Sequence, residues 1–172
     1  MNLISDEYRQ QNALLHSDTA TIYGAVGKVY ARLVDRLYLD FDCKSALDYG
    51  CGKGRMSQIL SHIPFRNYDP ALVEFAGLPT PADLLICLDV MEHIEPDYLE
   101  AVLKHTSSLM RKVGLISVCT RAAYKNLPDG RNAHLIVESS KWWLPRLMEH
   151  FKVLEFKESG NSFYIIAGPW KP

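Results

Sequence analysis

The feature that most constrains this chain is the segment 46–60, which joins a short apolar run to a glycine loop and the start of a helical pattern. Residues 46–49 resemble the end of a buried strand, and Gly50, Gly52 and Gly54 follow at once. Glycines let the backbone approach a ligand without an intervening side chain. A strand, a glycine turn and a helix start therefore predict a site for a nucleotide-like ligand.

An acidic residue at a defined distance strengthens this prediction. Asp69 lies 19 residues after Gly50, at the end of a second short run, 65–68, which predicts another parallel strand. A carboxylate in that place can accept hydrogen bonds from both hydroxyls of a ribose. The loop combined with this acid is a stronger signal than the loop alone.

Three successive motifs resemble those of the class I S-adenosylmethionine-dependent methyltransferases, over roughly residues 44–120. The motifs are Asp-Tyr-Gly-Cys-Gly-Lys-Gly at 48–54, Tyr-Asp-Pro at 68–70 and Cys-Leu-Asp-Val-Met-Glu-His-Ile at 87–94. The last is most similar to the branch called methyltransferase type 11 or 12. Gly54 comes one position earlier than the third glycine of a dinucleotide-binding Gly-x-Gly-x-x-Gly loop. This spacing favours S-adenosylmethionine over NAD.

The resemblance implies that the cofactor is S-adenosylmethionine and that S-adenosylhomocysteine is its product. Asp48 and the first two glycines are expected at the methionine end, Asp69 at the ribose and Val90 along the cofactor. The full set of expected cofactor residues is Asp48, Tyr49, Gly50, Cys51, Gly52, Asp69, Pro70, Leu88, Asp89 and Val90.

The expected fold class is α/β, a three-layer Rossmann-like methyltransferase fold with a mostly parallel sheet and a C-terminal antiparallel hairpin. A chain of 172 residues fits one domain. Within it, 1–40 is expected to form a helical lid, 44–120 the cofactor-binding half, and 121–172 a substrate loop and the closing hairpin.

The segment after Asp69 departs from the family pattern. Residues 70–82 are too few for a helix, a third strand and a further crossover, since one crossover alone takes about 10–12 residues. The third strand is therefore expected to be missing or vestigial. The adenine pocket would then be closed by other side chains, such as Leu72, Leu78 or Pro79.

Periodicity and turn residues predict the remaining elements. Gly114 is placed to end the helix that Pro96 begins, and Pro145 is expected to kink or restart a later helix. The further predicted helices are 6–15, 21–39 and 140–151, and the further predicted strands are 83–88, 115–120, 152–156 and 162–167.

Two histidines are candidates for a general base, because the unperturbed pKa of histidine is near 6.5. His134 lies in the polar loop 121–138, which leaves the carboxyl edge of the sheet, where functional loops concentrate. His93 follows the strand 83–88 at the same edge. The alternatives are that His134 is simply solvated and that His93 supports its loop.

Candidate substrate residues come from the same loop and from the N-terminal lid. Arg121 is a candidate for holding an anionic group, and Tyr124 lies close to it in the sequence. Tyr23 is a lid candidate, together with Tyr8 and His16. Ordinary core or surface packing is the alternative for each of them.

Charge and cysteine content exclude several classes of function. The formal net charge of −1 and the lack of a basic stripe argue against nucleic acid as a partner. The four cysteines form no Cys-x-x-Cys pair and no cluster of metal ligands, so no metal is expected, and reduced thiols indicate a cytoplasmic protein. The sequence contains no apolar stretch long enough to suggest a membrane-spanning helix.

The expected function is methyl transfer, by direct displacement, to a small molecule or a small exposed group. The main alternative is a noncatalytic S-adenosylmethionine-binding partner subunit, with which the shortened segment after Asp69 is compatible; a homodimer is also left open. An aminopropyl transferase and an NAD-linked oxidoreductase are further alternatives. Residues 88–91, Leu-Asp-Val-Met, lack the Asn/Asp-Pro-Pro sequence of enzymes that methylate amino groups of DNA.

Overall fold

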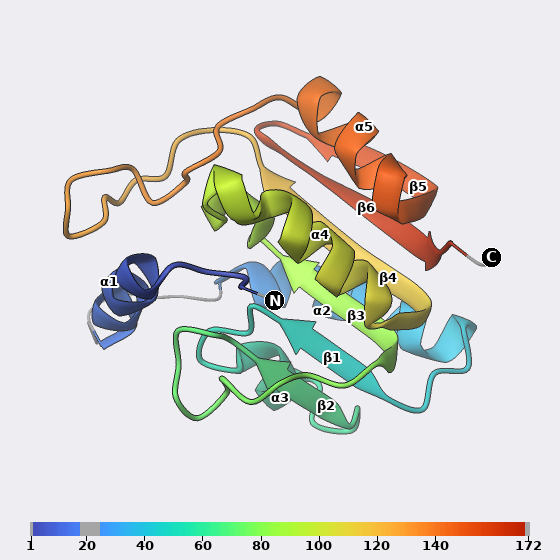
Figure 1. Cartoon of the computed structure of the whole chain (residues 1–172). Helices are drawn as coiled ribbons and strands as arrows, with labels where there is room; N and C mark the ends of the chain where they lie inside the picture. Colours follow the sequence, from blue (N-terminus) through green and yellow to red (C-terminus); the bar gives the residue numbers. More distant parts are fainter. Residues whose placement is uncertain (1, 18–24, 171–172) are drawn as a thin grey trace.

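Six strands form one mixed sheet in the order β2-β1-β3-β4-β6-β5 (Figure 1). The computed structural model describes residues 2–17 and 25–170. The strands are β1 Ala46–Tyr49, β2 Phe65–Tyr68, β3 Ala82–Leu88, β4 Met110–Cys119, β5 Phe151–Ser159 and β6 Ser162–Pro169. The helices are α1 Asp6–Ser17, α2 Ala25–Asp40, α3 Arg55–Ile59, α4 Leu99–Ser108 and α5 Ser140–His150, with two single 3₁₀ turns, η1 Met91–His93 and η2 Pro96–Tyr98.

Helices cover both faces of the sheet and complete a three-layer structure. In Figure 1, α4 and α5 lie in front of the sheet and α2 lies behind it. The front core includes Trp143 and Phe151, and the rear core includes Val34 and Met56, all almost inaccessible to solvent. The inner strand β3, and β4 from Val113 onward, are buried and mostly apolar, as expected for inner strands of a sheet that is covered on both sides.

The strand directions bring four carboxyl ends to one edge of the sheet. β1 runs parallel to β2 and β3, and β3 runs parallel to β4, whereas β6 is antiparallel to both β4 and β5. Helix α1 lies beside the arrowheads of β1 and β3 (Figure 1). Ligands of open α/β sheets bind at such an edge, so the topology places the candidate site under α1.

The predicted absence of a third strand is confirmed. Residues 69–81 form turns and bends between β2 and β3, and β2 is left as the edge strand of the sheet. The Arg66 side chain on this strand donates a hydrogen bond to the carbonyl oxygen of Pro81 at 2.9 Å. The shortened segment therefore packs back on the strand that it leaves exposed.

The predicted helix end at Gly114 is wrong. Helix α4 ends at Ser108, and Gly114 lies inside β4, where it pairs with Leu85 and Ala167. A Cβ atom at this position would lie 2.6 Å from the sulfur of Met110. The space that a side chain would need is occupied by Met110, which explains a glycine inside a strand.

The other differences are shifts of element ends. The closing hairpin is present, and its strands are longer than the predicted 152–156 and 162–167. Pro145 lies inside α5, which runs from Ser140 to His150 as one helix. In the described ranges 2–17 and 25–170, no helix combines the length and the apolar character that crossing a membrane requires.

Candidate functional site

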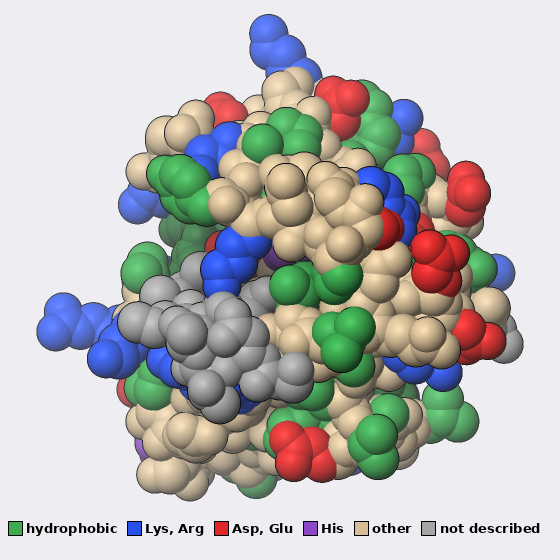
Figure 2. All heavy atoms as spheres, turned by 90° about the vertical axis from the view of Figure 1, so that its left-hand side faces the viewer, with side chains coloured by type: hydrophobic (Ala, Val, Ile, Leu, Met, Phe, Trp, Pro, Cys, Tyr) green, Lys and Arg blue, Asp and Glu red, His purple; other side chains and the backbone are tan. Residues whose placement is uncertain are grey.

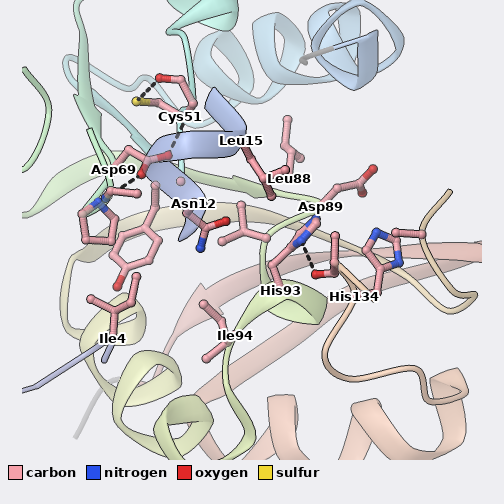
Figure 3. Close-up of a pocket in the computed structure, with 18 of the residues that line it drawn as sticks. Ile4, Asn12, Leu15, Cys51, Asp69, Leu88, Asp89, His93, Ile94 and His134 are labelled. Carbon is pink, nitrogen blue, oxygen red and sulfur yellow. Dashed lines mark hydrogen bonds between the residues drawn. The ribbon is translucent and has the colours of Figure 1, made fainter. Parts of the chain in front are cut away.

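A pocket of about 500 Å³ lies at the carboxyl edge of the parallel strands. Its walls are the glycine loop after β1, the residues after β2 and β3, the loop after β4, and the N-terminal segment with α1. Figure 3 shows Asp69 towards one end of the pocket, His93 and His134 towards the other, and Asn12 between them. Segments distant in the sequence thus share one cavity.

The glycine loop has a backbone that only glycine fits comfortably. Gly50 and Gly52 have φ angles of 77° and 50°, in the left-handed region. The backbone N–H groups of Gly50 and Cys51 both donate to the carbonyl oxygen of Tyr68, at 2.8 and 3.0 Å. A Cβ atom on Gly50 would lie 2.5 Å from a methyl group of Val90. The missing side chain is what allows the loop to approach the turn after β3.

Asp69 fastens the glycine loop to the turn after β2. Its side chain is buried, with one carboxylate oxygen accepting from the N–H of Gly52 at 3.0 Å and the other from the N–H of Ala71 at 3.0 Å. Each carboxylate oxygen can accept a second hydrogen bond. Asp69 can therefore hold the loop and still receive hydroxyl groups of a ligand.

Asp48 is a buried carboxyl in the same end of the pocket, with 6% of its surface exposed. Burial, helped by the negative charge of Asp69, raises the pKa of Asp48 to about 7. Both causes disfavour the carboxylate, whereas a cation placed beside it would stabilise the carboxylate and oppose them. This end of the pocket is therefore suited to a positively charged group of a ligand.

Asp89 begins the turn after β3 in a left-handed conformation, with φ of 53°. Its N–H donates to the carbonyl oxygen and to the hydroxyl of Ser117, at 3.1 and 3.0 Å, and that hydroxyl donates to the Asp89 carboxylate at 2.7 Å. Aspartate tolerates this backbone conformation better than most residues. Burial raises the pKa of Asp89, while the Ser117 hydrogen bond and the nearby His134 oppose the rise.

The two histidines lie edge to face, with ring centroids 4.7 Å apart. The Nδ1–H of His93 donates to the carbonyl oxygen of Ala133 at 2.8 Å, and that of His134 donates to the carbonyl oxygen of Arg121 at 2.6 Å. Carbonyl oxygens only accept, so Nδ1 carries the hydrogen in both rings and the lone pair of the neutral ring lies on Nε2. Both side chains line the pocket, and in the neutral ring Nε2 can act as an acceptor.

Glu92 ties the turn after β3 to the loop after β4. It is completely buried, its Oε1 accepts from the N–H of Cys119 at 2.8 Å, and its backbone carbonyl accepts from the N–H of Ile136 at 3.0 Å. Among the described residues, Oε2 has no hydrogen-bond partner. Burial raises the pKa of Glu92 well above its ordinary value, so the neutral carboxylic acid is favoured.

Helix α1 is attached to both sides of the pocket mouth. The hydroxyl of Tyr8 donates to the carbonyl oxygen of His93 at 2.6 Å, and Ser5 donates to the carboxylate of Glu95 through its N–H at 2.8 Å and its hydroxyl at 2.7 Å. On the other side, Gln11 donates to Asp129 at 2.9 Å. The N-terminal segment therefore forms a wall of the pocket, while its role as a lid stays a prediction.

The structure brings the predicted site residues together. All ten predicted cofactor residues line this pocket, as do His93, His134, Arg121 and Tyr124, while their individual roles stay predictions. Tyr8 also lines the pocket. Tyr23 and the side chain of His16 lie outside the described residues.

Several pocket residues were not predicted, and three predicted ones do not contribute. Leu72, Leu78 and Pro79 are absent from the pocket wall, and Leu78 is 88% exposed, so the prediction that they close it is wrong. The first helix instead lines the pocket with Tyr8, Asn12 and Leu15, side chains that carry only an ordinary amphipathic signal in the sequence. The unpredicted wall residues include Leu3, Ile4, Asn12, Leu15, Lys53, Arg55, Glu95, Cys119 and Lys125.

Charges are divided between the interior and the rim. Asp48, Asp69 and Asp89 lie inside the pocket, whereas Arg121 and Lys125 come from the loop after β4. Figure 2 shows the α1 side of the molecule, where Lys and Arg side chains gather around the grey atoms and acidic side chains lie mostly towards the right. The Arg121 guanidinium lies 4.0 Å from the centre of the exposed Tyr124 ring. The pocket therefore has an acidic interior and a partly basic mouth.

Comparison with known families identifies one domain type. A family model described as a methyltransferase domain matches residues 23–158, which is most of the chain. A search of curated protein sequences finds no match.

Solved structures with the same fold include several methyltransferases. The N-methyltransferase NodS from Bradyrhizobium japonicum WM9, in complex with S-adenosylhomocysteine, has a TM-score of 0.65 at 11% identity, over 95% of this chain and 100% of its own. The 1,6-didemethyltoxoflavin-N1-methyltransferase from Burkholderia thailandensis has a TM-score of 0.67 at 15% identity, over 99% of this chain and 94% of its own. The magnesium protoporphyrin IX methyltransferase from Synechocystis PCC 6803, with bound S-adenosylmethionine, has a TM-score of 0.63 at 16% identity, over 98% and 100%. At these identities the likeness concerns the fold.

Proposed function

This chain belongs to the methyltransferase-domain family and has the class I methyltransferase fold, and from that premise we propose that it transfers the methyl group of S-adenosylmethionine to a small acceptor. One observation carries the proposal. The glycine loop and the carboxyls Asp48 and Asp69 share a single pocket with two histidines. Donor-binding groups and proton-accepting groups thus face the same space.

The residues at one end of the pocket fit the proposed donor. Asp69 offers its remaining lone pairs to the ribose hydroxyls, and the side-chain-free surface of Gly50 and Gly52 permits a close approach of the backbone. Burial disfavours the ionised form of Asp48, and this carboxylate gains a partner when a cationic group enters the pocket. A ligand with both a ribose and a positive charge matches this arrangement better than a dinucleotide with its negative pyrophosphate.

When bound, S-adenosylmethionine supplies a methyl group that is already activated by a positively charged sulfonium. The protein then has to orient the acceptor, exclude water and remove a proton where the acceptor carries one. His93 and His134 supply lone-pair nitrogens for that proton, oriented by the carbonyl oxygens of Ala133 and Arg121. Helix α1 and its hydrogen bonds to Glu95 and Asp129 cover the pocket.

We place the acceptor between the histidines and the loop after β4. Ile4, Leu15 and Ile94 offer apolar surface there, and Arg121 and Lys125 offer positive charge. This combination supports a small acceptor that has an apolar body and a negatively charged group.

The alternative of a noncatalytic cofactor-binding subunit receives less support from the pocket. Such a subunit needs the glycine loop and the acidic residues but not a pair of oriented histidines in the same cavity. We therefore favour catalysis by this chain.

Formation of S-adenosylhomocysteine tests the proposal. The purified protein is incubated with S-adenosylmethionine and fractionated small-molecule extracts, and the product is measured by mass spectrometry. Parallel incubations without the protein serve as the control. Acceptor-dependent product that falls in a folded His93→Ala variant supports catalysis. Binding of the donor without turnover in any fraction, including fractions rich in carboxylates and phosphates, would favour the noncatalytic alternative.

A further inference from the structure

Three potential metal ligands from separate segments meet beside the pocket, and two of them line it. They are Glu92 from η1, Cys119 from the end of β4 and His134 from the loop that follows. A carboxylate oxygen, the cysteine sulfur and an imidazole nitrogen all lie within 4.8 Å of one another. We propose that these side chains bind one divalent metal ion, and that Zn²⁺ is the ion they suit.

Glu92 carries the strongest part of this inference. The residue is completely buried, and its Oε1 is held by the N–H of Cys119, one of the other two proposed ligands. Its Oε2 has no hydrogen-bond partner within the described part of the chain. Buried polar atoms are normally satisfied, and an orphaned carboxylate oxygen inside a cluster of donor atoms calls for an explanation. A bound cation supplies the missing partner.

His134 is oriented as metal-binding histidines usually are. Its Nδ1–H donates to the backbone carbonyl oxygen of Arg121 at 2.6 Å, so the lone pair lies on Nε2. Ligating histidines commonly donate their second ring N–H to a carbonyl or carboxylate, which fixes the tautomer. The sulfur of Cys119 has only a weak contact to the same carbonyl, at 4.0 Å. The thiol of Cys119 therefore has no strong hydrogen bond that an ion would need to break.

The donor set selects the kind of ion. Mg²⁺ and Ca²⁺ prefer oxygen ligands, whereas an imidazole and a thiolate are typical ligands of Zn²⁺. Ligand atoms of a tetrahedral zinc site with bonds of about 2.0–2.3 Å lie about 3.3–3.6 Å apart, so side-chain movements on the order of 1 Å would close the cluster. The Cys119 thiolate and the Glu92 carboxylate would neutralise the two positive charges, and their protons would be released to solvent.

No sequence spacing indicates this site, because its ligands are 27 and 15 positions apart along the chain. The expectation of no metal rested on the absence of clustered ligands in the sequence. A second group of donors, Glu100, Glu149 and His150, lies at the surface, and Glu100 already pairs with His150 at 2.9 Å. We draw nothing from that second group.

Three protein ligands would leave a coordination position open to the pocket, since Cys119 and His134 both line it. An ion in this place would hold an oxygen or nitrogen atom of the acceptor and lower its proton affinity, with His93 left to accept the proton. This consequence rests on the proposed methyl transfer, whereas the metal site itself does not.

The test is the binding of Co²⁺, a spectroscopic substitute for Zn²⁺, to the full chain after treatment with a chelator. One equivalent should bind and produce an absorption band of thiolate-to-cobalt charge transfer, and one equivalent of Zn²⁺ should abolish it by displacement. In Cys119→Ser the band should disappear, and in His134→Ala and Glu92→Gln the affinity should fall at least tenfold.

Matched variants make the test decisive. Cys43→Ala changes a buried cysteine in the rear core, and His62→Ala changes an exposed histidine, so both should retain the band and the affinity. The inference is overturned if no band forms, or if the band persists in Cys119→Ser and vanishes in Cys51→Ala. Circular dichroism of each variant shows whether it is folded. Binding of S-adenosylmethionine, measured on the same samples without metal, separates failure of this site from failure of the proposed function.

Discussion

Replacing Asp48 by Asn should stabilise the protein while weakening its binding of S-adenosylmethionine. Burial and the neighbouring Asp69 raise the pKa of Asp48 to about 7, against an ordinary value of 3.8. A raised folded-state pKa means that the stability due to the protonated carboxyl is fully present below about pH 4 and is lost as the pH rises through about 7. The full difference corresponds to on the order of 4 kcal/mol at pH 8. At pH 5 only about 1.7 kcal/mol of this loss has occurred.

The assay is unfolding by denaturant of the wild type and Asp48→Asn at pH 5 and at pH 8, without ligand. Asparagine has no charge to bury, so the advantage of the variant should grow by about 2–3 kcal/mol between the two pH values. The exposed Asp97→Asn is the control and should follow the wild type at both. Affinity for S-adenosylmethionine should fall in Asp48→Asn because a cation loses its carboxylate partner. A stability difference that is equal at both pH values would refute the argument that burial disfavours this charge.

Three further perturbations test other parts of the pocket. Asp69→Ala should weaken binding of S-adenosylmethionine by about 1–3 kcal/mol in calorimetry, since hydrogen bonds to a charged group are lost; an unchanged affinity in a folded variant would contradict the ribose assignment. Gly50→Ala should lower the free energy of unfolding by about 1–3 kcal/mol, because the new methyl group meets Val90 in a left-handed backbone; Gly77→Ala, with open space around it, should be near neutral. His134→Ala should lower turnover with the true acceptor at nearly unchanged cofactor affinity, and full activity would exclude this residue from the reaction.

The cofactor half of this fold could be predicted because its signals are local. The strand β2 has the bounds that the short run 65–68 indicated, and the missing third strand followed from counting the residues between Asp69 and β3. The glycine loop could be located because the backbone at Gly50 and Gly52 permits few other residues. Each of these arguments needs only neighbouring residues and chain length.

The remaining errors arise from contacts between distant segments. Gly114 has the local character of a helix stop, but the space beside it belongs to Met110 and the strand pairing continues through it. Helix α1 was expected as a lid, yet its contacts to Glu95 and Asp129 depend on how the loops after β3 and β4 fold. The hydrogen bond between Glu92 and Cys119 likewise depends on the pairing of β3 with β4, and no spacing of residues along the sequence predicts it. Such juxtapositions require the sheet to be assembled first.

The account depends most directly on which ligand the pocket takes. The measurement is calorimetric titration of the purified chain, first freed of any co-purified ligand, with S-adenosylmethionine, S-adenosylhomocysteine and NADH. We predict saturable binding of the two sulfur compounds with one site per chain, and no binding of NADH. A folded protein that binds neither sulfur compound, or that binds NADH instead, would contradict the assignment of this pocket to S-adenosylmethionine.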